Sequence, residues 1–246
     1  MNIVLFEADE VYLPLARQDA RAKHILSVLR REIGDTFDVG VINGPRGKAR
    51  VERIDKDNLI LEFELNETDP PLYPIELIVG LSRPQTNRRI LREATSLGVR
   101  RLSFVQTDRS EPSYAESRLW SSGEWKKHVL DGAAQAFATR IPEVFFGKAL
   151  KDSIFEIEGD LERIALDNYE SYTHLLDTRN EHPNIVLAVG SERGWSGDER
   201  NTLRATGFKL AHLGPRPLRT EAAVVAGLSM IAGRIDSVSE YKIRGE

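Results

Sequence analysis

Apolar and polar positions follow one pattern in the first quarter of the chain. Short runs of β-branched and other apolar residues alternate with the pairs Gly34-Asp35, Asn43-Gly44 and Asp57-Asn58. Such runs predict short strands, and such pairs predict the turns between them. The expected strands cover residues 3–6, 36–42, 49–54 and 59–65, and one helix is expected at 20–31. We therefore expect a small β-barrel with a helix.

A different pattern begins near residue 75, where short apolar runs alternate with stretches of helical periodicity. That alternation is typical of a parallel sheet covered by helices. The helix expected at 86–97 ends at Gly98 and has apolar residues on one face and arginines on another, so its basic side is available to a partner. The last helix, expected at 221–233, has no charge between its end residues, which predicts burial in the core or at a subunit interface. The expected strands cover residues 75–81, 102–105, 164–166, 185–189 and 209–213.

The two patterns are separated by residues 68–74, which contain three prolines. This composition is typical of a semi-rigid linker between domains. We therefore expect a β-barrel domain at residues 1–70 and an α/β domain at residues 71–246.

Composition narrows the chemistry and the location. The 246 residues include no cysteine, which excludes disulfides, thiolate zinc sites and a cysteine nucleophile. The N-terminus lacks the pattern of a signal peptide, and the longest uncharged segment, residues 222–233, is too short to span a bilayer. A cytoplasmic protein that does not enter the membrane is the expectation.

The formal net charge is −4, yet the basic residues are unevenly distributed. Residues 83–109 hold seven arginines against two acidic residues, and residues 17–53 hold nine basic residues against five acidic ones. Regions of this kind are either solvated faces or contact surfaces for a phosphate backbone. At this point both interpretations stay open.

The loop before the last helix is the most informative segment. Pro215 and Pro217 restrict its backbone. Thr220 is suited to be the N-cap, and Glu221 suits the positive end of the helix dipole. Arg219 opposes that dipole, which indicates a partner such as a carboxylate, a phosphate or an electron-rich carbonyl. The alternative interpretation is a capped helix after a rigid turn.

A second loop, residues 189–199, follows an expected strand and leads into a helix. Ser196 and Glu199 form a capping-box pattern. Glycines at 190, 194 and 197 allow a ligand close to the backbone, but their spacing fits neither a dinucleotide fingerprint nor a P-loop. The five histidines show no paired metal spacing, and no Gly-x-Ser-x-Gly pattern is present, so neither a metal site nor acyl transfer is expected.

Several blocks of residues, spread over nearly the whole chain, match one known family. The earlier blocks are residues 24–30 with Gly34-Asp35, 94–99, 108–110, and Gln135 with 140–142. The later blocks are residues 189–199, 213–216 and 218–221, of which the last two are the most specific. In these blocks the chain resembles the bacterial 16S ribosomal RNA (uracil-N3)-methyltransferase family, RNA methyltransferases of the SPOUT (α/β knot) class.

The resemblance implies a fold, a cofactor and partners. The fold is α/β, with an N-terminal PUA-like β-barrel and a C-terminal SPOUT domain whose parallel sheet is threaded into a trefoil knot. The cofactor is S-adenosylmethionine, no metal is required, and the working unit is a homodimer. The implied reaction is methylation of N3 of a specific uridine in the ribosomal RNA of the small subunit.

The resemblance also implies roles for particular residues of this chain. Arg219 would stabilise negative charge on the uracil, and Glu221 would be the base, the group that orients Arg219, or only a helix-capping acid. RNA would be contacted by Arg30, Arg83, Arg88, Arg89, Arg92 and Arg109. S-Adenosylmethionine would be held by Leu166, Val189, Gly190, Glu192, Gly194, Trp195, Leu213, Gly214, Pro215, Leu218, Arg219 and Thr220.

The chain departs from the family pattern in a few places. Gly190-Ser191-Glu192-Arg193-Gly194 stands where Gly-Pro-Glu-Gly-Gly is expected, so Arg193 replaces a glycine. Glu93, Ser96 and Pro217 are also unusual at their positions. Two alternatives therefore remain: a SPOUT methyltransferase for a different RNA or base, and a non-catalytic RNA-binding protein of ribosome assembly.

Overall fold

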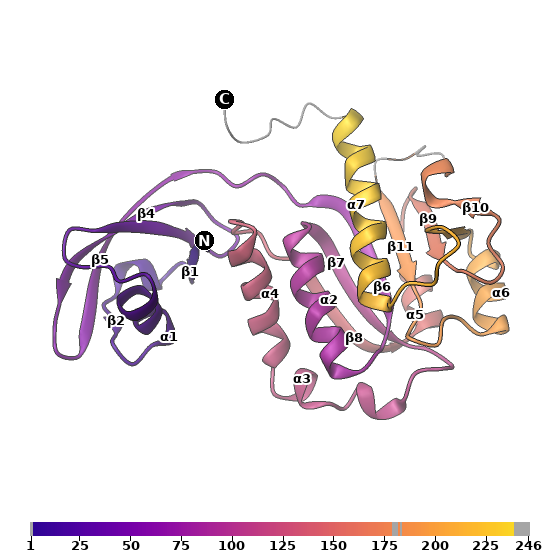
Figure 1. Ribbon diagram of the computed structural model, residues 1–246, viewed down its shortest axis with the longest axis horizontal. Helices are drawn as coiled ribbons and strands as arrows, with labels where there is room; N and C mark the ends of the chain where they lie inside the picture. Colours follow the sequence, from indigo (N-terminus) through magenta and orange to yellow (C-terminus); the bar gives the residue numbers. More distant parts are fainter. Residues whose placement is uncertain (1, 179–181, 183, 239–246) are drawn as a thin grey trace. The chain divides into compact units, whose positions relative to one another are not determined.

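The computed structural model of this chain describes residues 2–178, 182 and 184–238. Its contacts divide the chain into two units (Figure 1). The first unit is Met1–Pro71 together with Leu130–Ile141, and the second is Leu72–Val129 together with Pro142–Glu246. Each unit has its own sheet.

The sheet of the first unit is a half-barrel, which in the described residues has five strands in the order β1-β3-β4-β5-β2. Strand β1 runs parallel to β3, and the other neighbours are antiparallel. Side chains of β1 alternate, since Val4 and Phe6 pack into the half-barrel while Ile3 and Leu5 pack against Ala133. The strands are β1 (Val4–Phe6), β2 (Leu15–Ala16), β3 (Thr36–Val41), β4 (Arg46–Ile54) and β5 (Asn58–Glu67).

The helix expected at 20–31 is shorter and less regular than the sequence pattern predicts. It consists of α1 (Ala20–Lys23), which continues as a π-helical turn, η2 (His24–Val28). The Asp19 side chain accepts a hydrogen bond from the Arg21 backbone N–H and caps the start. Arg30, with φ of 53°, is in the left-handed region and prevents continuation. The prediction of one helix to residue 31 was therefore wrong.

Residues 130–141 join the first unit through a buried carboxylate. Asp69 accepts a hydrogen bond of 2.7 Å from the backbone N–H of Thr139 and pairs with Arg46 at 2.9 Å. Arg46 also donates to the carbonyl oxygen of Phe137, and Thr139 donates through its hydroxyl to the carbonyl of Gly44. These bonds satisfy polar groups that are buried, so the segment is fixed to the strands.

The sheet of the second unit is parallel throughout. Its seven strands in the described residues follow the order β10-β12-β9-β11-β6-β7-β8. The central strand β11 is apolar and buried along its length, as expected when both faces of a sheet are covered. The strands are β6 (Tyr73–Gly80), β7 (Val99–Gln106), β8 (Glu143–Ala149), β9 (Glu162–Leu166), β10 (Thr173–His174), β11 (Ile185–Val189) and β12 (Lys209–His212).

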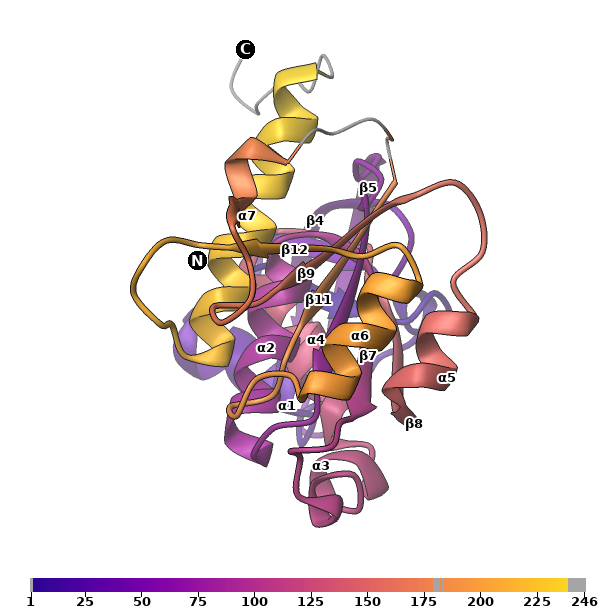
Figure 2. The same cartoon turned by 90° about the vertical axis from the view of Figure 1, so that its right-hand side faces the viewer.

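Helices cover both faces of this sheet (Figure 2), with α2 and α7 on one face and α5 and α6 on the other. Gly227 brings α7 close to the sheet, because a methyl group there would lie 3.0 Å from Leu187 and 3.2 Å from Leu166. The α-helices are α2 (Pro84–Ser96), α3 (Arg118–Ser121), α4 (Glu124–Gln135), α5 (Leu150–Phe155), α6 (Gly197–Ala205) and α7 (Thr220–Val238). Short 3-10 turns are η1 (Glu10–Tyr12), η3 (Pro112–Tyr114) and η4 (Leu175–Asp177).

The structure confirms the α/β class with a parallel sheet in the second part and a half-barrel in the first. The sequence pattern did not reveal β8 or β10, and α7 is longer than expected at both ends. The last helix was predicted to be buried in the core or at a subunit interface, and within the single chain Val224, Leu228 and Ile231 are buried while Ala222 and Ser229 are exposed. The interface alternative stays a prediction. The trefoil knot stays a prediction from the resemblance.

Candidate functional site

The site begins at the carboxyl ends of three neighbouring parallel strands. Leu166 at the end of β9 pairs with Val189 of β11 on one side and with Ala211 of β12 on the other. Parallel strands bring the loops that follow them to the same edge of a sheet, where α/β proteins bind ligands. We call these the β9 loop (residues 167–172), the β11 loop (190–196) and the α7 loop (213–219).

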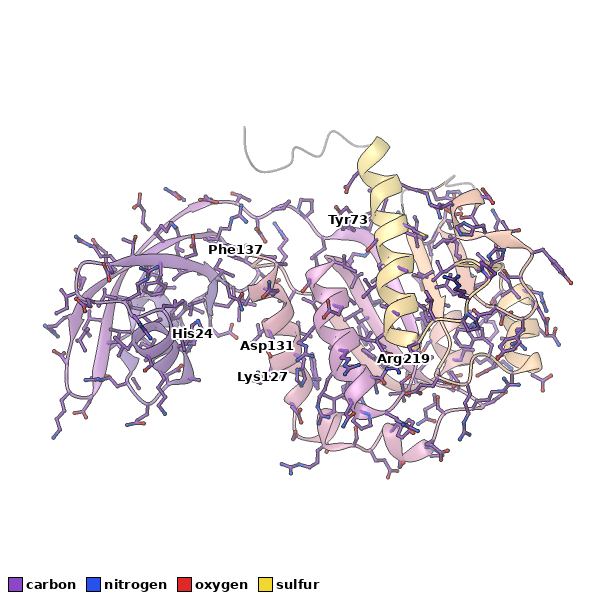
Figure 3. The ribbon with its side chains drawn as sticks, viewed as in Figure 1. His24, Tyr73, Lys127, Asp131, Phe137 and Arg219 are labelled. Atoms are coloured by element: carbon purple, nitrogen blue, oxygen red, sulfur yellow. The ribbon has the colours of Figure 1, made fainter. Side chains whose placement is uncertain are left out.

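These loops and the first turns of α2 and α7 enclose a cavity of about 720 Å³. This volume is within the range of small-molecule and cofactor sites, roughly 300–1,000 Å³. Figure 3 shows Arg219 at the start of α7, on the side of the cavity that α7 forms. The cavity is also lined by arginines from the start of α2 and from the β11 loop. One carboxylate each comes from the β9 loop, the β11 loop and the first turn of α7.

The β11 loop passes very close to neighbouring backbone. A methyl group on Gly190 would lie 3.0 Å from the α carbon of Gly194, and one on Gly80 would overlap the backbone nitrogen of Ser191. Gly194 also has φ of 64°, which a glycine adopts without strain. The Oγ atom of Ser191 is buried without a hydrogen-bond partner among the residues described. The loop therefore packs tightly on neighbouring backbone, and Gly190, Ser191 and Gly194 line the cavity.

Glu192 ties the β11 loop to the start of α2. Its Oε1 atom accepts hydrogen bonds from the backbone N–H of Arg83 at 3.0 Å and from the hydroxyl of Thr86 at 3.3 Å. No local side chain caps this helix. The carboxylate therefore serves as a long-range cap at the positive end of the helix dipole.

At the start of α7, Arg219 rather than Thr220 occupies the N-cap position, because the carbonyl of Arg219 accepts the first helical hydrogen bond, from Ala223. Thr220 is the first helical residue and is buried. The prediction of Thr220 as N-cap was therefore wrong. The Arg219 side chain is exposed and makes no hydrogen bond or ion pair with any described residue. A cation at this end of a helix is opposed by the dipole, so it is available to an anionic ligand.

Glu221 is already paired. It accepts from Arg89 of α2 at 3.2 Å, and its side chain is 19% exposed, against 57% for Arg89. The pair lies on the α2 and α7 side of the cavity, beside Arg219. A ligand that binds Arg89 would therefore compete with Glu221.

The β9 loop is organised by a buried ion pair. Asp167 pairs with Arg200 of α6 at 2.7 Å and accepts hydrogen bonds from the backbone N–H groups of Tyr169 and Glu170. The Arg200 guanidinium also lies 5.3 Å from the ring centroid of Tyr169. Both charges are satisfied, so the loop is held in one shape.

Trp195 has a structural role beneath the cavity. It is fully buried in the core between the sheet and α6, and its indole N–H donates to the carbonyl of Leu166 at 3.0 Å. Ser196 begins α6 with the expected capping box to Glu199, which confirms that prediction. The end of the β11 loop is thus tied to the end of β9.

Most residues that the resemblance assigns to the cofactor line this cavity. They are Leu166, Val189, Gly190, Glu192, Gly194, Trp195, Leu218, Arg219 and Thr220. Leu213, Gly214 and Pro215 do not line it, although they belong to the α7 loop. Sequence reasoning missed the paired Asp167 and Arg200, as well as Tyr169, Gln85 and Thr86. Only the place of Asp167 directly after a strand could have suggested the first of these.

The arginines assigned to RNA are in different environments. Arg83 and Arg89 line the cavity, while Arg30 lies exposed in the first unit. Arg88 forms an ion pair with Glu124 at 2.7 Å. The sequence predicted that the basic side of α2 is available to a partner, but this pair partly neutralises it. Arg88 and then His128 lower the pKa of Glu124 to about 2.

The β11 loop is also fixed through the residue that departs from the family pattern. Arg109 donates to the carbonyl of Arg193 at 2.9 Å, and the Arg193 side chain lies 3.5 Å from Glu111. The two loops that follow β7 and β11 are therefore linked to each other.

Arg92, which was also assigned to RNA, is half-buried on α2.

No group of three or more His, Cys, Asp or Glu residues in the described part of the chain could hold a metal ion. No helix within it is both long and apolar enough to cross a membrane.

Comparison with family models defines the class of protein. A model described as an RNA methyltransferase domain matches residues 68–232, and a model described as an RNA methyltransferase PUA domain matches residues 18–64. The cavity lies within the first of these ranges. The fold and the matches together define an RNA methyltransferase with a PUA domain.

Relatives specify the family. Ribosomal RNA small subunit methyltransferase E of Treponema pallidum is 35% identical over 240 residues, covering 94% of this chain and 90% of the relative. Methyltransferase E 1 of Borreliella burgdorferi is 27% identical, covering 96% and 99%. The crystal structure of the Neisseria gonorrhoeae enzyme E bound to S-adenosyl methionine has a TM-score of 0.74 at 22% identity, covering 95% of this chain and 98% of that one. The chain belongs to the ribosomal RNA small subunit methyltransferase E family.

Proposed function

We propose that this protein transfers a methyl group from S-adenosylmethionine to N3 of a specific uridine in the 16S ribosomal RNA of the small subunit. The observation that carries the proposal is Arg219, which has no partner among the described residues and lines a cofactor-sized cavity in a member of this family. Ribosomal RNA as substrate is consistent with a cytoplasmic location. The structure of the related Neisseria protein with S-adenosyl methionine supports the choice of cofactor.

The residues of the cavity fit this cofactor. Gly190 and Gly194, which have no side chains, line the cavity, and the buried Ser191 hydroxyl lacks a partner among the described residues. Leu166, Val189 and Leu218 supply apolar surface for an adenosine ring system. When bound, S-adenosylmethionine supplies an electrophilic methyl group on a positively charged sulfur.

Residues of the chain have to accept the N3 proton of the uracil and stabilise the negative charge that its loss leaves. Methyl transfer would replace the N3–H bond with a bond from N3 to the methyl carbon, and the electron pair of the former carbon–sulfur bond would stay with S-adenosylhomocysteine. Arg219 stabilises the anion that develops on the uracil as its proton leaves. Glu221 accepts the proton or orients Arg219, and its place in the first turn of α7 also suits a helix-capping acid. Orientation of donor and acceptor supplies the rest of the acceleration.

We also propose that the protein works as a homodimer and contacts RNA phosphates. One side of α7 leaves Val225, Ala226 and Met230 only partly buried, and an apolar helix surface of this kind is suited to a second copy of the chain. The arginines assigned to RNA are Arg30, Arg83, Arg88, Arg89, Arg92 and Arg109.

Methylation of small ribosomal subunits and of protein-free 16S RNA by the purified protein tests the proposal. The RNA is digested to nucleosides and the product identified by mass spectrometry against synthetic standards. We expect 3-methyluridine at one position. Another methylated nucleoside would identify a methyltransferase for a different base, and RNA binding without any product would indicate an assembly protein.

Variants of the α7 loop test the assignment of Arg219. Arg219→Ala should lower the methylation rate roughly 100-fold or more while leaving the circular dichroism spectrum unchanged. Arg216→Ala is the matched control, because Arg216 is exposed in the same loop but does not line the cavity. Equal rates for the two variants would remove Arg219 from the mechanism.

A further inference from the structure

Tyr169 is an exposed aromatic residue at the cavity that the proposed reaction does not use. Its side chain lines the cavity, yet the residue is 74% exposed. Tyr172, in the same β9 loop, is 98% exposed and does not line the cavity. Two tyrosines of one loop thus differ in their relation to the site.

The position of the Tyr169 ring is set by its surroundings. Its Cε2 atom is 3.7 Å from where a methyl group on Gly194 would be, so the ring lies beside the β11 loop. Asp167 accepts from the Tyr169 backbone N–H at 2.9 Å, and Arg200 holds the ring from its place in the buried ion pair. These neighbours favour one position of the ring before any ligand binds, which lowers the entropic cost of a contact.

We propose that Tyr169 stacks on the adenine of S-adenosylmethionine and forms the outer wall of the adenosine site. This inference rests on the proposed function. An ordered aromatic ring with a free surface at the rim of a cavity is suited to a planar, uncharged ring. Adenine has such a ring, and stacking of a base on an aromatic side chain contributes a measurable part of binding.

The side of the cavity on which Tyr169 lies favours the cofactor over the RNA base. Tyr169 belongs to the β9 loop and contacts the β11 loop, beside the apolar Leu166 and the glycines of the cofactor segment. The charged groups assigned to the uracil, Arg219 and Glu221, come from the beginning of α7. The adenine and the target base therefore have separate sets of residues.

Calorimetry with S-adenosylhomocysteine tests the assignment on the full-length chain. Tyr169→Ala should raise the Kd about 5- to 100-fold, whereas Tyr169→Phe, which keeps the ring, should stay within about threefold of the wild type. Tyr172→Ala is the matched control and should not change the Kd. Adenosine alone should lose affinity for the Tyr169→Ala variant by a similar factor, because the lost contact is to the adenine.

The possible outcomes separate this inference from the proposed function. An unchanged Kd in Tyr169→Ala, with a raised KM for RNA, would show that the ring contacts the RNA and would overturn the inference. An unchanged Kd and an unchanged KM would also overturn it. A wild-type protein that binds no S-adenosylhomocysteine would instead contradict the proposed function itself.

Discussion

Gly80, at the end of β6, controls the path of the β11 loop. A methyl group there would overlap the backbone nitrogen of Ser191 and lie 3.1 Å from the carbonyl carbon of Gly190. Backbone cannot move aside as a flexible side chain can, so the loop would have to shift away from β6. The shape of the cofactor cavity thus depends on a residue that does not line it.

Gly80→Ala should lower the free energy of unfolding by about 1–3 kcal/mol and weaken binding of S-adenosylhomocysteine. Gly197→Ala is the control, because a methyl group at Gly197 would have no neighbour within 4 Å. Urea denaturation and calorimetry measure the two effects. If both variants behaved alike, the close approach of β6 to the β11 loop would not shape the site.

Single residues of the site were predictable where their chemistry conflicts with local structure. Arg219 was identified because a cation opposes the helix dipole, and the structure leaves that cation without a partner among the described residues. Asp167 and Arg200 could not be paired in advance, because they are 33 residues apart and only the fold brings them together. The same holds for Glu192, whose partners Arg83 and Thr86 precede it by more than 100 residues.

Among the elements, α1 is held by a charged cluster of the first unit. The half-buried Arg21 makes ion pairs with Glu10 at 2.6 Å and with Asp19 at 2.9 Å. Hydrogen bonds from Arg21 are the largest cause that lowers the pKa of each carboxyl. These acids are therefore charged more readily in the folded chain than in the unfolded one.

The Arg21 cluster predicts a pH-dependent contribution to stability. Because both folded pKa values are lowered, the contribution is present above the ordinary values of 4.5 and 3.8 and is lost as the pH falls below them. Arg21→Met should be less stable than the wild type by about 1–2 kcal/mol at pH 7. This difference, measured by urea denaturation, should shrink below pH 4. A difference that stayed constant to pH 2.5 would contradict the assignment.

Elements with a regular pattern were predicted better than those without one. The buried strand β11 was expected at its observed residues, 185–189, because five apolar residues follow one another. Strand β8 was missed, since it is an edge strand with mostly exposed side chains and two adjacent phenylalanines. The π-helical turn after α1 also has no simple periodic signal.

At the scale of the whole molecule, local sequence patterns cannot predict the order of the strands in the sheet. Strand β12 lies beside β9 rather than beside its predecessor β11, and this order brings the α7 loop next to the β9 loop. Residues 130–141 belong to the first unit through Asp69, which lies 70 residues before Thr139. Only the family resemblance carried information over such distances.

The proposed dimer gives a prediction for the whole molecule. In solution the protein should have twice the 27.7 kDa mass of the chain. Met230→Glu, on the partly buried side of α7, should shift it to the monomer without unfolding it, because a charge cannot be buried there without a partner. Asn201→Glu, on the exposed surface of α6, should leave the mass unchanged. Light scattering during size-exclusion chromatography measures the mass in solution. A monomeric wild type would refute the dimer.

The central claim is that the β9, β11 and α7 loops form one site for S-adenosylmethionine. A crystal structure of the protein with S-adenosylhomocysteine tests it most directly. We predict the adenosine beside Gly190, Gly194 and Leu218, with the sulfur directed toward Arg219. Ligand density outside this cavity, or a cavity that stays closed at saturating concentrations, would contradict the account.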